Sequence, residues 1–302
     1  MYSRTFLTAV GIGTWLAVAL TAAPRINHRH STNMRNDNDG PMKSCSDLHI
    51  EFDGREAVVQ SEEKTISKSQ AGTLHVEAES NGGLQVQGWD GDNYSVTLCK
   101  AAEPGNDAER ILSQIKLNIE GGQVSVTGPS HDRDDSDWSA YLLVRAPKGA
   151  MLNLNVNNGP VSVYGVQGNI TAKAVNGPVS MKDANGDIDL TAENGPISVD
   201  GISGKVHLRT QNGPVDVNLS GQAWTGEGVD AHATNGPVTV RVPQGYKSGV
   251  VVESDGNGPF SCHASVCSQG RKTWDDDHKR IEFGTGPVVV RVSTVNGPVS
   301  VE

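Results

Sequence analysis

A single tripeptide, Asn-Gly-Pro, recurs through the second half of the chain and limits what the chain can fold into. Four copies begin at Asn158, Asn176, Asn194 and Asn212, at intervals of eighteen residues. Between consecutive copies lie two short segments in which apolar and polar residues alternate, which is the pattern of a strand with one buried face. We therefore predict that each interval forms two strands and two turns.

The apolar positions of these segments keep their register from one interval to the next. Ile170 corresponds to Ile188 and then to Val206, and Thr210 is the one polar residue at such a position. A two-strand unit cannot bury its apolar face alone, whereas stacked units share a continuous core. The sequence thus predicts an all-β fold, a narrow β-solenoid whose two-strand coils contain about 18 residues and rise by about 4.8 Å each.

The repeat continues less evenly on both sides of this regular part. Asn-Gly-Pro also begins at Asn235, Asn257 and Asn296, after longer intervals. We expect the solenoid to cover most of residues 73–302 and to be interrupted by insertions. The expected insertions are residues 106–114, 130–138 and 261–279. Apolar residues at helical spacing predict a short helix within residues 102–116.

The three residues of the tripeptide are interpreted as turn residues. Asn and Gly tolerate a positive φ, and Pro fixes φ at the entry to the next strand. Stacked Asn side chains could also hydrogen-bond along the solenoid axis. This structural interpretation is favoured over a ligand-binding row, since identical turns give a uniform ridge rather than converging groups. The predicted structural turns are Asn158, Gly159, Pro160, Asn176, Gly177, Pro178, Asn194, Gly195, Pro196, Asn212, Gly213, Pro214, Asn235, Gly236 and Pro237.

The N-terminal residues have the layout of an export signal. Arg4 precedes an apolar run over residues 6–20, and small residues follow it. A cleaved signal peptide is favoured, and an uncleaved anchor stays open because residues 6–23 could just span a bilayer. We therefore expect an extracytoplasmic protein, in the periplasm, at the cell surface or secreted. The domains expected are a signal peptide or anchor (1–23), a disordered polar leader (24–44), irregular β rungs with a short helix (45–150) and the regular solenoid (151–302).

Four cysteines follow the export signal, and an even number in an exported chain indicates disulfides. Three connectivities are open; we favour Cys45 with Cys99 and Cys262 with Cys267, because the second pair is local. Zinc is the rival interpretation for Cys262, His263 and Cys267, but a fourth ligand is lacking in this pattern. No metal or other cofactor is expected.

Charge limits the partners that the protein can have. The chain has 25 Lys and Arg against 35 Asp and Glu, a net charge of -10, which repels the phosphates of nucleic acids and anionic lipids. We expect no nucleic-acid partner, and contact with a membrane only through an uncleaved N-terminal segment.

The repeated strings NGPVSV and NGPISV, separated by GNI, GDI and GKV and preceded by YLLVRAPKGA at residues 141–150, resemble the bacterial putative-adhesin β-strand-repeat family. The resemblance covers the C-terminal half well and the N-terminal part loosely, and the domain of that family has no established function. It implies a right-handed β-helix-like solenoid at the cell envelope with a non-enzymatic, adhesin-like role. It supplies no catalytic or binding residues.

Catalysis finds little support in the sequence. The acidic runs at residues 132–137 and 275–277 lack the Gly and the terminal Glu of an EF-hand and the Gly-rich nonapeptide of calcium-binding β-rolls, so we interpret them as solvated loops. Histidines such as His207 are scattered, and no Ser, His and acid trio can be assembled from spacing. A β-helix enzyme acting on polysaccharides remains an alternative, and so does a membrane-anchored sensory or regulatory ectodomain.

The outward positions of the second strand in each coil form the expected contact surface. Short polar side chains on a flat sheet suit extended partners. We therefore expect a binding or envelope scaffold protein whose partner is a glycan or an envelope protein. The expected contact strip consists of Ser162, Ser180, Ser198, Asp216 and Thr239.

Overall fold

We analysed a computed structural model of the 302-residue chain. The structure describes residues 32–36, 40–130, 138–256, 258–275 and 277–302. The expected signal peptide or anchor (1–23) lies outside these residues, as does most of the acidic loop at 130–138. None of the helices in the described part of the chain has the length and apolar character that a membrane crossing requires.

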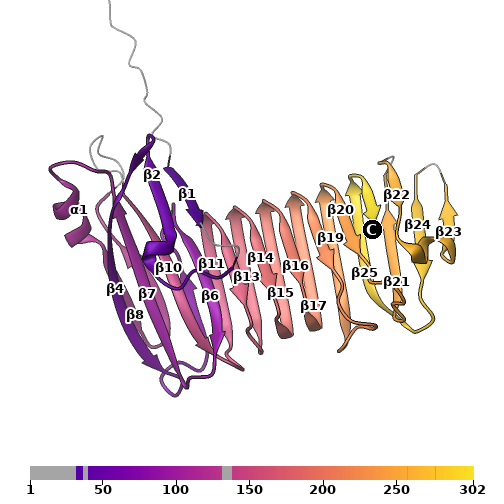
Figure 1. Ribbon diagram of the computed structural model, residues 1–302, viewed down its shortest axis with the longest axis horizontal. Helices are drawn as coiled ribbons and strands as arrows, with labels where there is room; N and C mark the ends of the chain where they lie inside the picture. Colours follow the sequence, from indigo (N-terminus) through magenta and orange to yellow (C-terminus); the bar gives the residue numbers. More distant parts are fainter. Residues whose placement is uncertain (1–31, 37–39, 131–137, 257, 276) are drawn as a thin grey trace, which may run out of the picture. The chain divides into compact units, whose positions relative to one another are not determined.

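Two sheets form the regular part of the protein, and the chain alternates between them (Figure 1). The 12-stranded sheet contains β11 (Leu152–Asn158), β13 (Ile170–Asn176), β15 (Asn185–Asn194), β17 (Ser203–Asn212) and β19 (Gly228–Asn235). The 11-stranded sheet contains β12 (Val161–Tyr164), β14 (Val179–Lys182), β16 (Ile197–Asp200), β18 (Val215–Asn218) and β20 (Val238–Arg241). Neighbouring strands are parallel, and Ile170 pairs with Ile188, eighteen residues later. The all-β solenoid is confirmed; its right-handed sense stays a prediction.

The inward-facing side chains of both sheets form one continuous core. Val161 and Val179 of the 11-stranded sheet and Ile170 and Ile188 of the 12-stranded sheet are almost fully buried. Thr210, the polar exception in the repeat, is buried as well, and its hydroxyl donates a hydrogen bond of 3.0 Å to the carbonyl oxygen of Gly195. A buried hydroxyl is tolerated when it has such a partner, so Thr210 does not break the core.

The glycines of the tripeptide lie in a column in which consecutive coils approach closely. A β-carbon at Gly177 would lie 2.1 Å from the carbonyl oxygen of Gly159, and one at Gly213 would lie 2.2 Å from that of Gly195. The φ angles of Gly159 and Gly177 are 154° and 159°. The close approach of backbone atoms, rather than the φ angle, is the property that requires glycine along the whole column.

The tolerance of Asn for a positive φ does not explain why Asn occurs in these turns, contrary to the expectation from the sequence. Among the described residues, only Asp53 and Asp183 have a positive φ without being glycine. Asn176 and Asn194 are instead the last residues of strands β13 and β15. Their side chains hydrogen-bond from coil to coil, as described below.

The C-terminal coils do not stack in sequence order. Strand β25 (Val288–Asn296) lies between β19 and β21 (Gly249–Ser254), and β26 (Val299–Val301) lies between β20 and β22 (Phe260–Cys262) (Figure 1). The last two strands of the chain thus enter between two earlier coils. Beyond them, η2 (Ser265–Ser268) leads to an antiparallel hairpin of β23 (Arg271–Trp274) and β24 (Lys279–Phe283) at the edge of the 12-stranded sheet.

The N-terminal end of the solenoid departs from the repeat in a similar way. Strands β5 (Leu74–Glu77) and β6 (Gly83–Trp89) pair with β11 and β12, although residues 90–151 lie between the two pairs of strands in the sequence. The intervening chain extends both sheets. Its elements are β7 (Asn93–Ala102), α1 (Ala108–Gln114), β8 (Lys116–Glu120), β9 (Gln123–Thr127) and β10 (Trp138–Pro147), with β4 (Val58–Ser67) at the edge beside β7.

The interpretation of residues 24–44 as a disordered leader is wrong for its C-terminal part. Residues Thr32–Asn36 form β1, which pairs antiparallel with β2 (Leu48–Phe52), and β3 (Arg55–Glu56) completes a small third sheet. Met42 is buried together with apolar side chains of β2 and of the 11-stranded sheet. Backbone pairing and this one methionine order a segment whose composition is otherwise polar.

Candidate functional site

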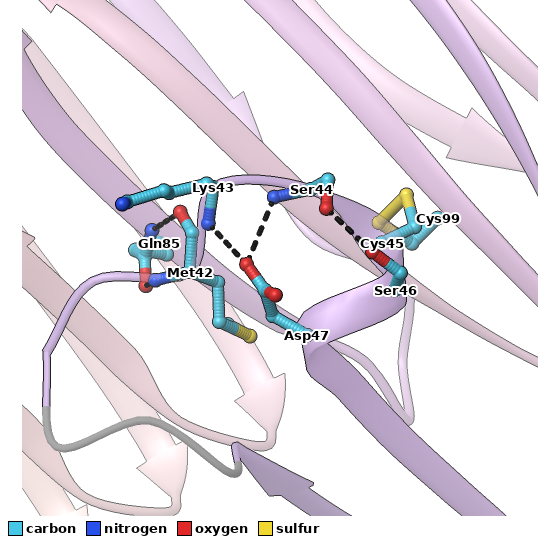
Figure 2. The surroundings of a disulfide bond; sticks show 8 residues. All are labelled: Met42, Lys43, Ser44, Cys45, Ser46, Asp47, Gln85 and Cys99. Atoms are coloured by element: carbon cyan, nitrogen blue, oxygen red, sulfur yellow. Dashed lines mark hydrogen bonds between the residues drawn. A yellow bond between two sulfur atoms is a disulfide. The ribbon is translucent and has the colours of Figure 1, made fainter.

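Both expected disulfides form, Cys45 with Cys99 and Cys262 with Cys267. Cys45 begins the short 3-10 helix η1 (Cys45–Asp47), and Cys99 lies on β7. The first bond therefore fastens the segment of residues 40–47, which we call the strap, to the 11-stranded sheet (Figure 2). The zinc interpretation of Cys262 and Cys267 is excluded by their bond.

Hydrogen bonds fix the strap to the sheet at Met42 and stabilise the turn within the strap at Asp47 (Figure 2). The amide of the buried Gln85 side chain donates to the Met42 carbonyl and its oxygen accepts from the Met42 backbone N–H, both at 2.8 Å. The carboxylate of Asp47 accepts from the backbone N–H groups of Lys43 and Ser44, at 2.7 and 3.3 Å. The strap is thus fixed on the sheet by a disulfide and a two-bond amide pair.

The residues of the expected contact strip lie side by side on the 11-stranded sheet. Ser162 pairs in register with Ser180, Ser180 with Ser198, Ser198 with Asp216, and Asp216 with Thr239. All five are exposed or half-buried. The Ser180 hydroxyl donates to that of Ser162 at 2.9 Å. These side chains form a straight row whose members are one strand spacing, about 4.8 Å, apart.

A second outward row runs beside the contact strip and is largely neutralised within itself. The Asn218 amide donates to the Asp200 carboxylate at 2.8 Å, and the Lys182 ammonium lies 3.8 Å from the same carboxylate. At its end, the guanidinium of Arg241 lies 4.0 Å from Asp216 and 3.3 Å from Glu302. Its paired charges leave few groups for an ionic ligand.

The Asn side chains of the turns form a continuous ladder along one edge of the solenoid. The Asn176 amide donates to Asn158 at 2.8 Å, Asn194 to Asn176 at 3.0 Å, and Asn212 to Asn194 at 2.9 Å. The ladder continues through Asn235 to Asn296, each step being 3.0 Å. Because each of these amides is engaged by its neighbours, the ladder offers a ligand fewer free groups than the contact strip does.

A polar pocket lies beside the strap, and the sequence did not reveal it. It has a volume of about 200 Å³, and we call it the strap pocket. Its lining comes from the strap and from four strands of the 11-stranded sheet, which supply residues far apart in the sequence. The polar residues that line it are Lys43, Ser44, Ser61, Glu63, Gln85, Gln87, Ser95, Thr97 and Arg145. The alternating Gln85 and Gln87 in β6 are the one local signal for such a surface.

Ionisable groups near the edge strand β4 are perturbed by their neighbours. Burial acts to raise the pKa of Glu62, but hydrogen bonds and charge interactions with Lys100 and Lys64 outweigh it and hold that pKa below its ordinary value. The buried Lys100 ammonium lies 2.7 Å from the Glu62 carboxylate.

Burial, and secondarily Tyr164, raises the pKa of the Tyr141 phenol far above its usual range, so Tyr141 stays neutral.

The acidic runs and the histidines form no recognisable catalytic or metal site in the described residues. His207 Nδ1 lies 3.9 Å from Asp230, and His278 Nδ1 lies 2.8 Å from Asp255. No group of three His, Cys, Asp or Glu side chains there could hold a metal ion. Residues 132–137 and Asp276 lie outside the described residues.

The sequence from residue 45 to residue 302 matches the Toastrack DUF4097 family. The chain belongs to this family. The match covers the disulfide-bonded N-terminal strands as well as the regular coils, so the Toastrack family includes both parts. It confirms the expected membership of an adhesin-like β-strand-repeat family without an established function.

Solved structures also resemble this Toastrack chain, at low identity. A putative cell adhesion protein from Clostridium sporogenes is 11% identical, with a TM-score of 0.32 and coverage of 81% of this chain and 99% of the other. A putative adhesin from Bacteroides fragilis is 10% identical, with a TM-score of 0.37 and coverage of 81% and 97%. A putative lipid binding protein from Parabacteroides distasonis is 9% identical, with a TM-score of 0.33 and coverage of 81% and 97%. A search of curated proteins gave no match.

Proposed function

We propose that this is an exported, non-enzymatic binding protein of the cell envelope whose contact strip binds an extended glycan. The observation that carries the proposal is the in-register row of Ser162, Ser180, Ser198, Asp216 and Thr239 on an open sheet face. Short hydroxyl and carboxylate side chains at a regular spacing can each exchange hydrogen bonds with the hydroxyl groups of successive sugars.

Export is supported by the two disulfides, which persist in oxidising compartments. The solenoid itself supports a flat rather than a concave site, because each coil repeats the outward positions of the last. A flat row suits binding of a long partner over many weak contacts and does not gather acid and base groups around one bond. These properties favour an adhesin or scaffold over an enzyme.

The proposal is tested by binding of the full chain to envelope polysaccharides, measured by glycan array and then by calorimetry. We expect binding that weakens when Ser180 is replaced by Tyr, because a large side chain would block the centre of the row. Ser293→Tyr would be unsuitable as a control because Ser293 contacts His232 at 2.9 Å. Thr171→Tyr, on the outward face of the other sheet, is the matched control and should bind as the wild type does. Failure to bind any envelope polysaccharide would contradict the proposal.

The mass of the protein recovered from its source cells tests the export part of the proposal. A mature chain that has lost its first twenty or so residues indicates a cleaved signal peptide. A full-length chain in the membrane fraction indicates an anchor, and a full-length chain in the cytoplasm would contradict export.

A further inference from the structure

The strap pocket continues the contact strip rather than lying apart from it. Gln85, which lines the pocket, pairs in register with Ser162, the first residue of the contact strip. Gln87, beside it in the pocket, pairs with Tyr164 of the neighbouring row. A chain lying along the contact strip and reaching Ser162 would therefore meet the strap, and its end would lie at the pocket.

The size of the strap pocket suits one ring of such a chain. Its volume is about 200 Å³. An engineered cavity of about 150 Å³ holds a benzene ring, so this volume is sufficient for a single six-membered sugar ring. Strap residues from Met42 to Cys45 line the pocket, whereas no strap residue lies beside the later members of the contact strip in the sheet order.

The charges of the strap pocket favour an acid. Lys43 and Arg145 both line it, both are exposed, and neither side chain has an ion-pair partner among the described residues. The Glu63 carboxylate accepts a hydrogen bond of 2.6 Å from the Ser95 hydroxyl. Among the residues that line the pocket, two cations stand against one carboxylate, in a chain whose net charge is -10. The nearby Asp47 carboxylate is engaged by the backbone N–H groups of Lys43 and Ser44. Arg145 offers the planar fork that binds a carboxylate through two hydrogen bonds.

We propose that the strap pocket binds the terminal residue of an acidic glycan, a hexuronic acid, with its carboxylate at Arg145 and Lys43. The ring hydroxyls exchange hydrogen bonds with Glu63, Thr97 and Gln87, which line the same pocket. The inference rests on the proposed function, because it takes the contact strip to hold the rest of the glycan. It makes the protein a reader of chain ends rather than of chain interiors.

Calorimetric titration of the full chain with glucuronic acid and with glucose tests this assignment. We expect the acid to bind and glucose to bind at least tenfold more weakly, since hydrogen bonds to a charged group are stronger than those between neutral groups. Arg145→Gln should weaken binding of glucuronic acid about tenfold or more and leave glucose unchanged. Arg291→Gln, an exposed arginine on the other sheet, is the matched control. Circular dichroism of each variant verifies that it is folded.

The outcomes separate this inference from the proposed function. Glucuronic acid that does not bind, or that binds Arg145→Gln as well as the wild type, overturns the assignment of the pocket even if a polysaccharide still binds at the contact strip. Conversely, glucuronic acid is too short to occupy the contact strip, so Ser180→Tyr should leave its affinity unchanged. A loss of glucuronic acid binding in Ser180→Tyr would place the acid on the contact strip and also overturn the assignment.

Discussion

A β-carbon added to Gly195 would lie 2.1 Å from the carbonyl oxygen of Gly177 in the neighbouring coil. The same relationship links Gly177 to Gly159 and Gly213 to Gly195, so it is a property of the stacking and not of one turn. Backbone atoms cannot rotate away as a side chain can. The spacing of the coils at this corner therefore depends on the absence of any side chain.

Replacing Gly195 by Ala should consequently destabilise the solenoid. We expect a loss of about 1–3 kcal/mol or more, because the added methyl group forces two coils apart. Urea unfolding measures it. Gly105→Ala is the control, because a β-carbon at Gly105 would have no atom within 4 Å. Equal stability of the two variants would show that the coils can shift to accommodate the methyl group.

The Asn ladder should contribute stability in proportion to the hydrogen bonds that each amide makes. Asn194 donates to Asn176 and accepts from Asn212. Asn194→Ala removes both bonds at an exposed site, and we expect a loss of about 1 kcal/mol. Asn157→Ala, at an exposed position of β11 in the same sheet, should have little effect. A cost for Asn157→Ala as large as that for Asn194→Ala would contradict a specific role of the ladder.

The two disulfides should differ in what they contribute to stability. Cys45 and Cys99 are 54 residues apart, and Cys262 and Cys267 are 5 apart. In the chain-entropy description, the longer loop stabilises by about 4 kcal/mol and the shorter by about 2 kcal/mol. Unfolding of the Cys45→Ser/Cys99→Ser and Cys262→Ser/Cys267→Ser variants compares them. The reverse order would indicate that the strap is held mainly by its hydrogen bonds to Gln85.

Acid should weaken the protein partly through Glu62. Its pKa is held below the ordinary value of 4.5, so the stability that it contributes is present above pH 4.5 and is lost as the pH falls through the lower pKa of the folded state. Glu62→Gln should therefore be less stable than the wild type at pH 7, and the gap should narrow in acid. Urea unfolding at pH 7 and in acid measures this difference in stability, with Glu120→Gln as an exposed control. A gap that stays constant with pH would contradict the assignment.

The regular coils could be predicted from the sequence because every coil repeats the same register. The correspondence of Ile170 with Ile188 gives the coil length, and the stacked Asn side chains follow from it. Thr210 fits the same pattern once its hydrogen bond to Gly195 is known. In these places, local sequence and neighbouring coils impose the same arrangement.

The two ends of the solenoid could not be predicted in this way. Asn235 is followed in the ladder by Asn296, 61 residues later, because β25 and β26 insert beside β19 and β20. Spacing alone does not distinguish this arrangement from stacking in sequence order. The strap was missed for a related reason: Met42 is a single apolar residue in polar surroundings, and its partners lie on β2 and on distant strands of the sheet.

Hydrogen–deuterium exchange of the full chain, with and without a bound uronic-acid polysaccharide, tests the central claim most directly. The account predicts added protection in β12, β14, β16, β18 and β20 and in the strap. It does not predict protection that is restricted to the 12-stranded sheet. Protection restricted to the 12-stranded sheet, or an exchange pattern that the polysaccharide leaves unchanged, would contradict it.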